Sequence, residues 1–204
     1  LPVPEAPPAS RLTVAAEAGL HRLVSELASA ALGGDGRDVL VRTGASTALA
    51  RSIAGGFRAD VLVASGDEAI DILARADRLA PEPPVPLAET RLVVALGATA
   101  GLPAHPAEHL LSPEVRSIAI GAADTELGQT TRSALSAIGI WFELLPRIQP
   151  VPTAEVALNR LRRGWCDAAI VFGVDAAGAR GVQVLEEAFP PGSCPPVWIQ
   201  AVLL

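Results

Sequence analysis

Small and hydroxyl-bearing residues recur in four turns, each of which follows an apolar strand and opens a helix. The turns are residues 17–19, 44–47, 124–129 and 152–154. The first turn of a helix carries unpaired N–H groups and about half a positive charge. Several such helix ends facing one cleft can bind an anion without lysine or arginine. Ser46, Thr47 and Thr153 taken singly are explained as helix caps, so the prediction of an anion site depends on the four turns together.

Catalytic and metal-binding patterns are weak in this sequence. The motifs HExxH, CxxC and GxSxG are absent, as is a phosphate-binding Gly-Lys-Ser loop. His105 and His109 are spaced four residues apart but lack a third ligand, which is more typical of a surface turn. Asp124 and Glu126 could act as bases, although we expect them to be solvent-facing loop charges. We therefore expect no catalytic residues, no metal site and no cofactor.

The two cysteines, Cys166 and Cys194, permit one disulfide. An even number of cysteines is typical of exported proteins, but two is a small number, so the bridge is left open. We expect both residues in the same lobe, each shortly before a strand.

Composition excludes several kinds of partner. The net charge is −6, and all 16 basic residues are arginines without a polybasic run. Nucleic acids and anionic membrane surfaces need a basic footprint, so neither is expected as a partner. No apolar run reaches the roughly 18 residues that a transmembrane helix needs, so membrane insertion is not expected. Residues 1–10 lack an initial Met and are rich in Pro and Ala, which indicates an extended or disordered segment at a processed or trimmed end.

Alternating apolar strands and amphipathic helices must position these turns. Leu20, Leu23, Val24, Leu27, Ala28 and Ala31 have the spacing of one buried helical stripe. The first half then reads β-α-β-α-β-α, which is typical of a parallel sheet covered by helices. A proline-rich stretch at residues 81–86 predicts a connection between lobes. We expect strands at residues 12–16, 38–42, 60–64, 91–96, 117–121, 168–172, 181–185 and 197–203, and later helices near 129–138 and 154–163.

The predicted fold class is α/β with two lobes and a ligand cleft between them. Lobe I spans residues 11–87, and lobe II spans residues 88–204, including a return hinge strand near 197–203.

Several segments in order resemble the periplasmic molybdate-binding proteins of ABC importers. They are residues 12–16, 48–56, 59–63, 91–95, 117–121, 134–141, 168–176 and 189–193. The resemblance covers residues 12–204 and implies a type II periplasmic-binding-protein-like fold with a hinge and a buried oxyanion. It also implies a periplasmic or otherwise extracytoplasmic location, an ABC permease as partner and a monomeric protein. Members of that family continue beyond the last strand with a helix that closes the first lobe, whereas this sequence ends at Leu204.

The resemblance also predicts which residues bind the ligand. The family's first Ser falls on Gly19 and its Tyr on Phe172, so two side-chain hydroxyls are missing, while Glu17 replaces a small residue. The second Ser falls near Thr47. Each charge-assisted hydrogen bond contributes about 1.5–3 kcal/mol, so we expect weak molybdate binding or a different anion. The predicted ligand-binding set is Gly19, Ser46, Thr47, Leu127, Gln129, Ala154 and Phe172.

Three functions are compatible with these observations. The first is capture of a small oxyanion, such as molybdate or tungstate, for an ABC importer. The second is a ligand-sensing module of the same fold that binds a different small anion and signals to a partner protein. An enzyme is disfavoured because no nucleophile–base pair is visible.

Overall fold

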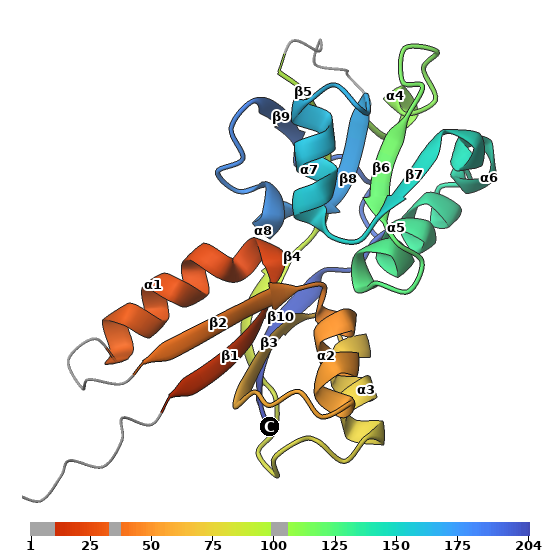
Figure 1. Ribbon diagram of the computed structural model, residues 1–204. Coiled ribbons are helices and arrows are strands. Elements are labelled where there is room, and N and C mark those ends of the chain that lie inside the picture. Colours follow the sequence, from red (N-terminus) through yellow and green to blue (C-terminus); the bar gives the residue numbers. More distant parts are fainter. Residues whose placement is uncertain (1–10, 33–37, 99–105) are drawn as a thin grey trace, which may run out of the picture.

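The computed structural model describes residues 11–32, 38–98 and 106–204, and it contains two lobes (Figure 1). Each lobe is built on one five-stranded sheet covered by helices, with strand orders β2-β1-β3-β10-β4 and β7-β6-β8-β5-β9. The predicted two-lobed α/β fold is therefore confirmed. The expectation of an extended segment at residues 1–10 lies outside the described residues.

The first sheet has a parallel part and an antiparallel part. Strands β1 (Leu12–Glu17), β2 (Val39–Gly44) and β3 (Val61–Ser65) are parallel. Strand β10 (Val197–Leu203) runs antiparallel between β3 and β4 (Val85–Thr90). Side chains alternate between the two faces of a strand, so one face meets α2 (Ser46–Ala54) and α3 (Glu68–Arg75), and the other meets α1 (His21–Leu32).

The second sheet repeats this arrangement and contains the larger core. Its strands are β5 (Leu92–Gly97), β6 (Ile118–Gly121), β7 (Ile148–Val151), β8 (Ala168–Phe172) and β9 (Val182–Leu185). Strands β6 and β8 are buried along their whole length, as expected for strands covered on both faces. The helices are α4 (Pro106–His109), α5 (Glu126–Ala137), α6 (Trp141–Leu144), α7 (Ala154–Arg162) and α8 (Gly173–Ala176), and short 3-10 turns are η1 (Ala18–Leu20) and η2 (Leu145–Arg147).

Two chain crossings join the lobes. The first lies between β4 and β5, at Arg91, and the second leads from β9 back to β10. The sequence division grouped residues 197–203 with lobe II, but hydrogen bonding places this strand in the first sheet, between β3 and β4.

The sequence did not predict two strands, β4 and β7. Both contain a proline, Pro86 in β4 and Pro150 in β7, and both lie at the edge of a sheet. Proline lacks the N–H group that a central strand donates, so it is tolerated at an edge. The stretch at residues 81–86, expected to connect the lobes, thus leads into an edge strand of the first lobe.

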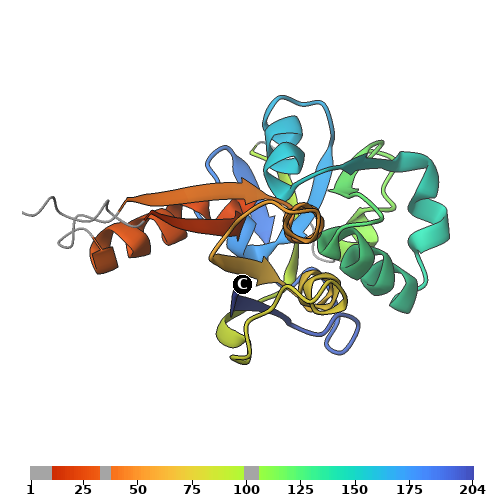
Figure 2. The ribbon, with the colours of Figure 1, turned by 60° about the horizontal axis from the view of Figure 1, so that its bottom comes forward.

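Helix α1 departs from its expected burial. Leu20 and Val24 pack against the sheet, but Leu23 and Leu27 are 52 % and 58 % exposed. Figure 2 shows α1 lying along one face of β1 and β2, with its far end extending away from the second lobe. The apolar stripe is therefore only half covered, because no second layer packs on its outer side within the described residues.

The cysteines do not form the disulfide that the sequence left open. Cys166 and Cys194 both pack against the core of the second lobe, as expected, but both are free thiols. Burial raises the pKa of each thiol, and neighbouring backbone groups at Ala119 and Leu92 oppose the shift.

Within the described residues no helix is long and apolar enough to cross a membrane.

Candidate functional site

The turns singled out from the sequence meet between the two lobes. The first lobe contributes the end of β1 and the start of α2, and the second lobe contributes the starts of α5, α7 and α8 (Figure 1). Together they enclose a cavity of about 10 Å³, which is about the space that one water molecule occupies. The lining residues are Glu17, Ala45, Ser46, Thr125, Glu126, Leu127, Pro152, Thr153, Ala154, Phe172 and Asp175.

Capping threonines fix two of these helix starts. The Thr125 side chain accepts a hydrogen bond from Gly128 N at 3.1 Å, and Thr153 accepts one from Val156 N at 3.3 Å. Thr125 Oγ1 also donates to Ala122 O at 2.7 Å. These bonds hold the first turns of α5 and α7 so that their N-terminal ends face the cavity.

A carboxylate of the protein itself occupies the donors at the start of α2. Glu17 is buried, and its Oε2 accepts hydrogen bonds from Ser46 N at 2.8 Å and from Ser46 Oγ. Ser46 Oγ in turn accepts from Ser65 N at 3.0 Å. Burial raises the pKa of Glu17, and the bonds from Ser46 act in the opposite direction. The Ser46 N–H and hydroxyl groups, which the sequence predicts as ligand-binding groups, thus donate to Glu17 in this structure.

A second carboxylate, that of Asp175 in the second lobe, also lines the cavity. A Cβ atom added to Gly19 would lie 1.7 Å from Asp175 Oδ1, so this carboxylate fills the space that a side chain at position 19 would need. Burial raises the pKa of Asp175 to about 7, as does the charge of Glu17, while the N–H groups of Phe172 and Gly19 act in the opposite direction. Oδ1 is buried, and although these N–H groups lie close enough to act on the pKa, no group among the described residues meets Oδ1 in hydrogen-bond geometry.

Direct contacts hold the lobes together beside the cavity. Thr47 Oγ1 donates to Asp124 O at 3.1 Å, and Arg51 pairs with the Asp124 carboxylate at 2.7 Å. Arg51 also donates to Asp124 O at 3.2 Å. Asp124, expected to be a free loop charge, is therefore a contact between the lobes.

Glu126 forms another such contact. Its carboxyl lies against Gly66, where an added Cβ would be 2.2 Å from Glu126 Cδ. It accepts a hydrogen bond from Thr130 at 3.3 Å, and burial raises its pKa. Beyond it lies a second interlobe cavity of about 380 Å³, lined in part by Gln129, Asp67 and Trp198.

The predicted ligand-binding residues separate into three groups. Ser46, Leu127, Ala154 and Phe172 line the small cavity, and Gly19 adjoins it through Asp175. Thr47 is directed at Asp124, and Gln129 lines the neighbouring cavity.

The sequence analysis did not select Glu17 or Asp175 as site residues. An acidic residue in place of a small one at position 17 was a usable signal. The sequence contained no signal for Asp175, because only the fold brings α8 against η1.

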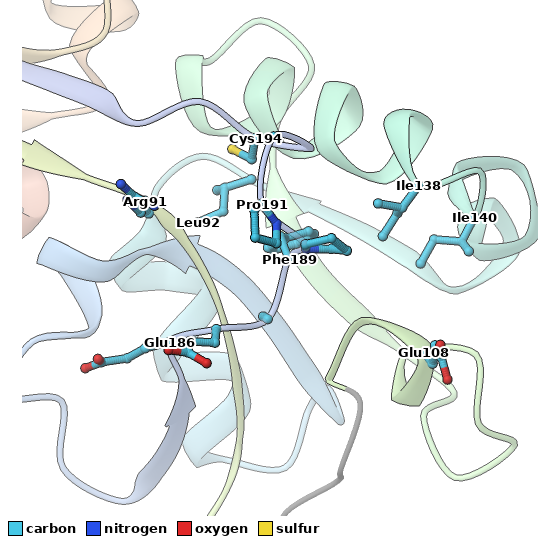
Figure 3. Close-up of a pocket in the computed structure, with 13 residues that line it drawn as sticks. Arg91, Leu92, Glu108, Ile138, Ile140, Glu186, Phe189, Pro191 and Cys194 are labelled. Carbon is cyan, nitrogen blue, oxygen red and sulfur yellow. The ribbon is translucent and has the colours of Figure 1, made fainter.

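A larger hollow lies elsewhere, on the second lobe. A cavity of about 890 Å³ lies between the segment at residues 186–194 and the ends of β5 and α5. Figure 3 shows Phe189, Ile138 and Ile140 around it, with Glu186 at the lower left and Glu108 at the lower right of the view. None of the four turns contributes to it. Within the described residues no group of three or more His, Cys, Asp or Glu side chains could hold a metal ion, and His105 lies outside those residues.

Comparison with known proteins defines the class. The chain matches the family of bacterial extracellular solute-binding proteins over residues 12–204 and belongs to that family. No curated protein sequence matches it significantly.

Solved structures with the same fold include several receptors for small solutes. The periplasmic molybdate-binding protein of Azotobacter vinelandii superposes with a TM-score of 0.79 at 22 % identity, covering 94 % of this chain and 84 % of that one. The sulfate-binding protein SubI of Mycobacterium tuberculosis gives 0.72 at 16 % identity, with coverages of 95 % and 75 %. Peb3 of Campylobacter jejuni gives 0.70 at 15 %, with coverages of 94 % and 86 %. At these identities the likeness shows the two-lobed periplasmic-binding fold alone.

Proposed function

We propose that this protein captures a small polar solute between its lobes, outside the cytoplasm, and delivers it to an ABC permease. The observation that carries the proposal is the convergence of the α2, α5 and α7 starts with two buried carboxylates at one interlobe cavity. Binding between the lobes would favour the state in which they touch, because a ligand shifts the population toward the form that it contacts on both sides. A permease can then recognise that form.

The oxyanion that the sequence resemblance implies is one candidate solute. The N-terminal ends of α5 and α7 support it, since Leu127 and Ala154 lie at the cavity with the positive ends of their helices. The Glu17 carboxylate opposes it, because an oxyanion must displace this group from Ser46. Molybdate and sulfate are named for the solved relatives and serve as the first probes.

A thermal-shift panel tests the proposal. Molybdate, tungstate, sulfate, phosphate, small carboxylates and small amines are added one at a time. A solute at 100 times its dissociation constant stabilises the folded protein by about 2.7 kcal/mol.

Two variants locate the binding site. Ala154→Leu adds volume at a buried position of the cavity and should abolish the shift, whereas Ala177→Leu, at an exposed position, should preserve it. Binding that Ala154→Leu leaves intact would reject the interlobe site.

The second candidate is a sensory module that reports a different small anion to a partner protein. Stimulation of a co-encoded permease's ATPase by the loaded protein supports transport, and binding to a signalling protein only when loaded supports sensing.

A further inference from the structure

The interlobe cavity has exchanged hydrogen-bond donors for acceptors. Position 19 has no side chain and Phe172 has no hydroxyl, so neither residue provides a side-chain donor. Glu17 and Asp175 instead bring two carboxylates to the cavity wall. The Ser46 N–H and hydroxyl, which remain, are directed at Glu17.

Glu17 is buried, Asp175 is half-buried with its Oδ1 inaccessible, and neither forms an ion pair with a cation among the described residues. The charge of Glu17 raises the pKa of Asp175, and among the described residues no arginine contributes to the pKa of either group. Asp175 lines the cavity, and its Oδ1 is buried against Gly19, where no group among the described residues meets it in hydrogen-bond geometry. A buried polar atom without a partner costs about 1–3 kcal/mol, more when it is charged. The site thus has one acceptor without a hydrogen-bond partner and two acidic groups whose pKa values are both raised, so that a cation would favour their ionised forms.

The other charged groups around the cavity do not supply the missing cation. Arg51 on α2 pairs with Asp124. Glu126 on α5 is directed at Thr130 and Gly66. Glu155, in the first turn of α7, is exposed.

We propose that the cavity binds the primary ammonium group of a small organic amine, held between Glu17 and Asp175. This inference rests on the proposed function, because it assumes that the solute binds between the lobes. The space of about 10 Å³ matches one water-sized group, and an ammonium head has that size. A metal ion is a poorer fit, because the described residues provide no cluster of three metal-ligating side chains.

The N-terminal ends of α5 and α7 remain compatible with this ligand. The cavity has room for the ammonium group alone, so the rest of an amino alcohol or amino acid requires the lobes to stand further apart, where these helix ends would face its hydroxyl or carboxylate. Every ligand in this class carries a cationic group with N–H donors.

Isothermal titration calorimetry on the whole chain tests the proposal. The probes are ethanolamine, glycine and methylammonium, with tetramethylammonium as the control because it is cationic but has no N–H group. Bound ammonium favours the ionised form of Asp175, so binding should release protons and tighten about tenfold from pH 5.5 to 7.5. Tetramethylammonium should not bind.

Matched variants assign the effect to the two carboxylates. Glu17→Gln and Asp175→Asn should each weaken ethanolamine at least tenfold while leaving the protein folded by circular dichroism. Glu155→Gln removes the same charge from an exposed position next to the cavity and should change the affinity less than twofold.

The outcomes distinguish this inference from the proposed function. Binding of molybdate or sulfate that tightens as the pH falls would overturn the ammonium assignment and leave solute capture standing. Binding of calcium or zinc in place of the amines would also overturn it. Amine binding that survives both Glu17→Gln and Asp175→Asn would remove the site from this cavity. Absence of binding by every solute in both panels would reject the proposed function itself.

Discussion

Two acidic residues decide what the interlobe site can do. Glu17 takes the hydrogen bonds of Ser46, and Asp175 takes the space beside Gly19. An oxyanion-binding site needs donors where this protein places acceptors. On the proposed ammonium assignment, these two side chains give a cation preference to a cavity that the helix N-terminal ends alone would make favourable for anions.

Asp175 should make stability depend on pH. Its folded pKa of about 7 exceeds the ordinary value of 3.8, so the folded protein holds a proton that the unfolded chain has already released. This contribution to stability is present below about pH 4 and is lost as the pH rises toward about 7. The difference between the folded and the ordinary pKa corresponds to about 4 kcal/mol at most. We expect Asp175→Asn to raise the free energy of unfolding at pH 8 by about 1–3 kcal/mol.

Urea unfolding between pH 4 and pH 8 measures this effect. Asp71→Asn, which removes an exposed carboxylate paired with Arg75, is the control and should change stability by less than about 0.5 kcal/mol. An unchanged pH profile for Asp175→Asn would contradict the burial of this carboxylate.

Gly19 and Asp175 should be energetically coupled. Because an added Cβ would overlap Asp175 Oδ1, Gly19→Ala should lower the free energy of unfolding by about 1–3 kcal/mol. In an Asp175→Ala background the same change should cost less than about 0.5 kcal/mol. A double-mutant cycle by urea unfolding gives the coupling, and additive effects would refute the contact.

At the scale of elements, the site depends on how closely α5 approaches β6. An added Cβ at Gly128 would lie 2.0 Å from Ala122 O and 2.6 Å from Gly121 O. Only a residue without a side chain allows the first turn of α5 to pack against the end of β6. Thr125, which caps this turn, then places Leu127 at the cavity.

Gly128→Ala should therefore destabilise the protein although alanine favours helices. We expect a loss of about 2–3 kcal/mol, because the overlap with backbone oxygens exceeds the gain of about 1 kcal/mol in helix propensity. Gly97→Ala is the control, since an added Cβ there has no neighbour within 4 Å. Urea unfolding compares the two variants, and hydrogen exchange should show faster exchange in α5 for Gly128→Ala. Equal stability of the two variants would contradict this packing.

At the scale of the whole molecule, one ion pair among the described residues joins the two lobes. Arg51 and Asp124 form an ion pair across the cleft, with side chains 48 % and 64 % exposed. An exposed pair contributes about 0–1 kcal/mol. That is small against the stability of either core, but it acts directly on the balance between separated and touching lobes.

Arg51→Ala should shift this balance toward separated lobes. We expect the ratio of touching to separated forms to fall by a factor of about two to five, seen as a larger radius of gyration in small-angle X-ray scattering. Salt at about 0.5 M should reduce the difference from the unchanged protein. Arg75→Ala breaks a pair inside α3 and should leave the radius unchanged. A compact Arg51→Ala protein would show that other contacts hold the lobes together.

The sequence by itself determined the lobes and the positions of most central strands. Buried strands such as Ala168–Phe172 are continuous apolar runs, and helices such as α7 begin at a capping residue, Thr153. These signals are local, since each depends on residues within one or two turns of the chain. Edge strands β4 and β7 escaped prediction because proline weakens the same local signal.

Tertiary structure alone decided the chemistry of the site. The sequence placed Ser46, Leu127 and Ala154 near one cleft, because the ends of parallel strands gather at the same edge of a sheet. It could not show that Glu17 would bond Ser46, or that Asp175 would lie against Gly19. Those contacts join residues far apart in the chain, and they form only after both sheets are folded and the lobes meet.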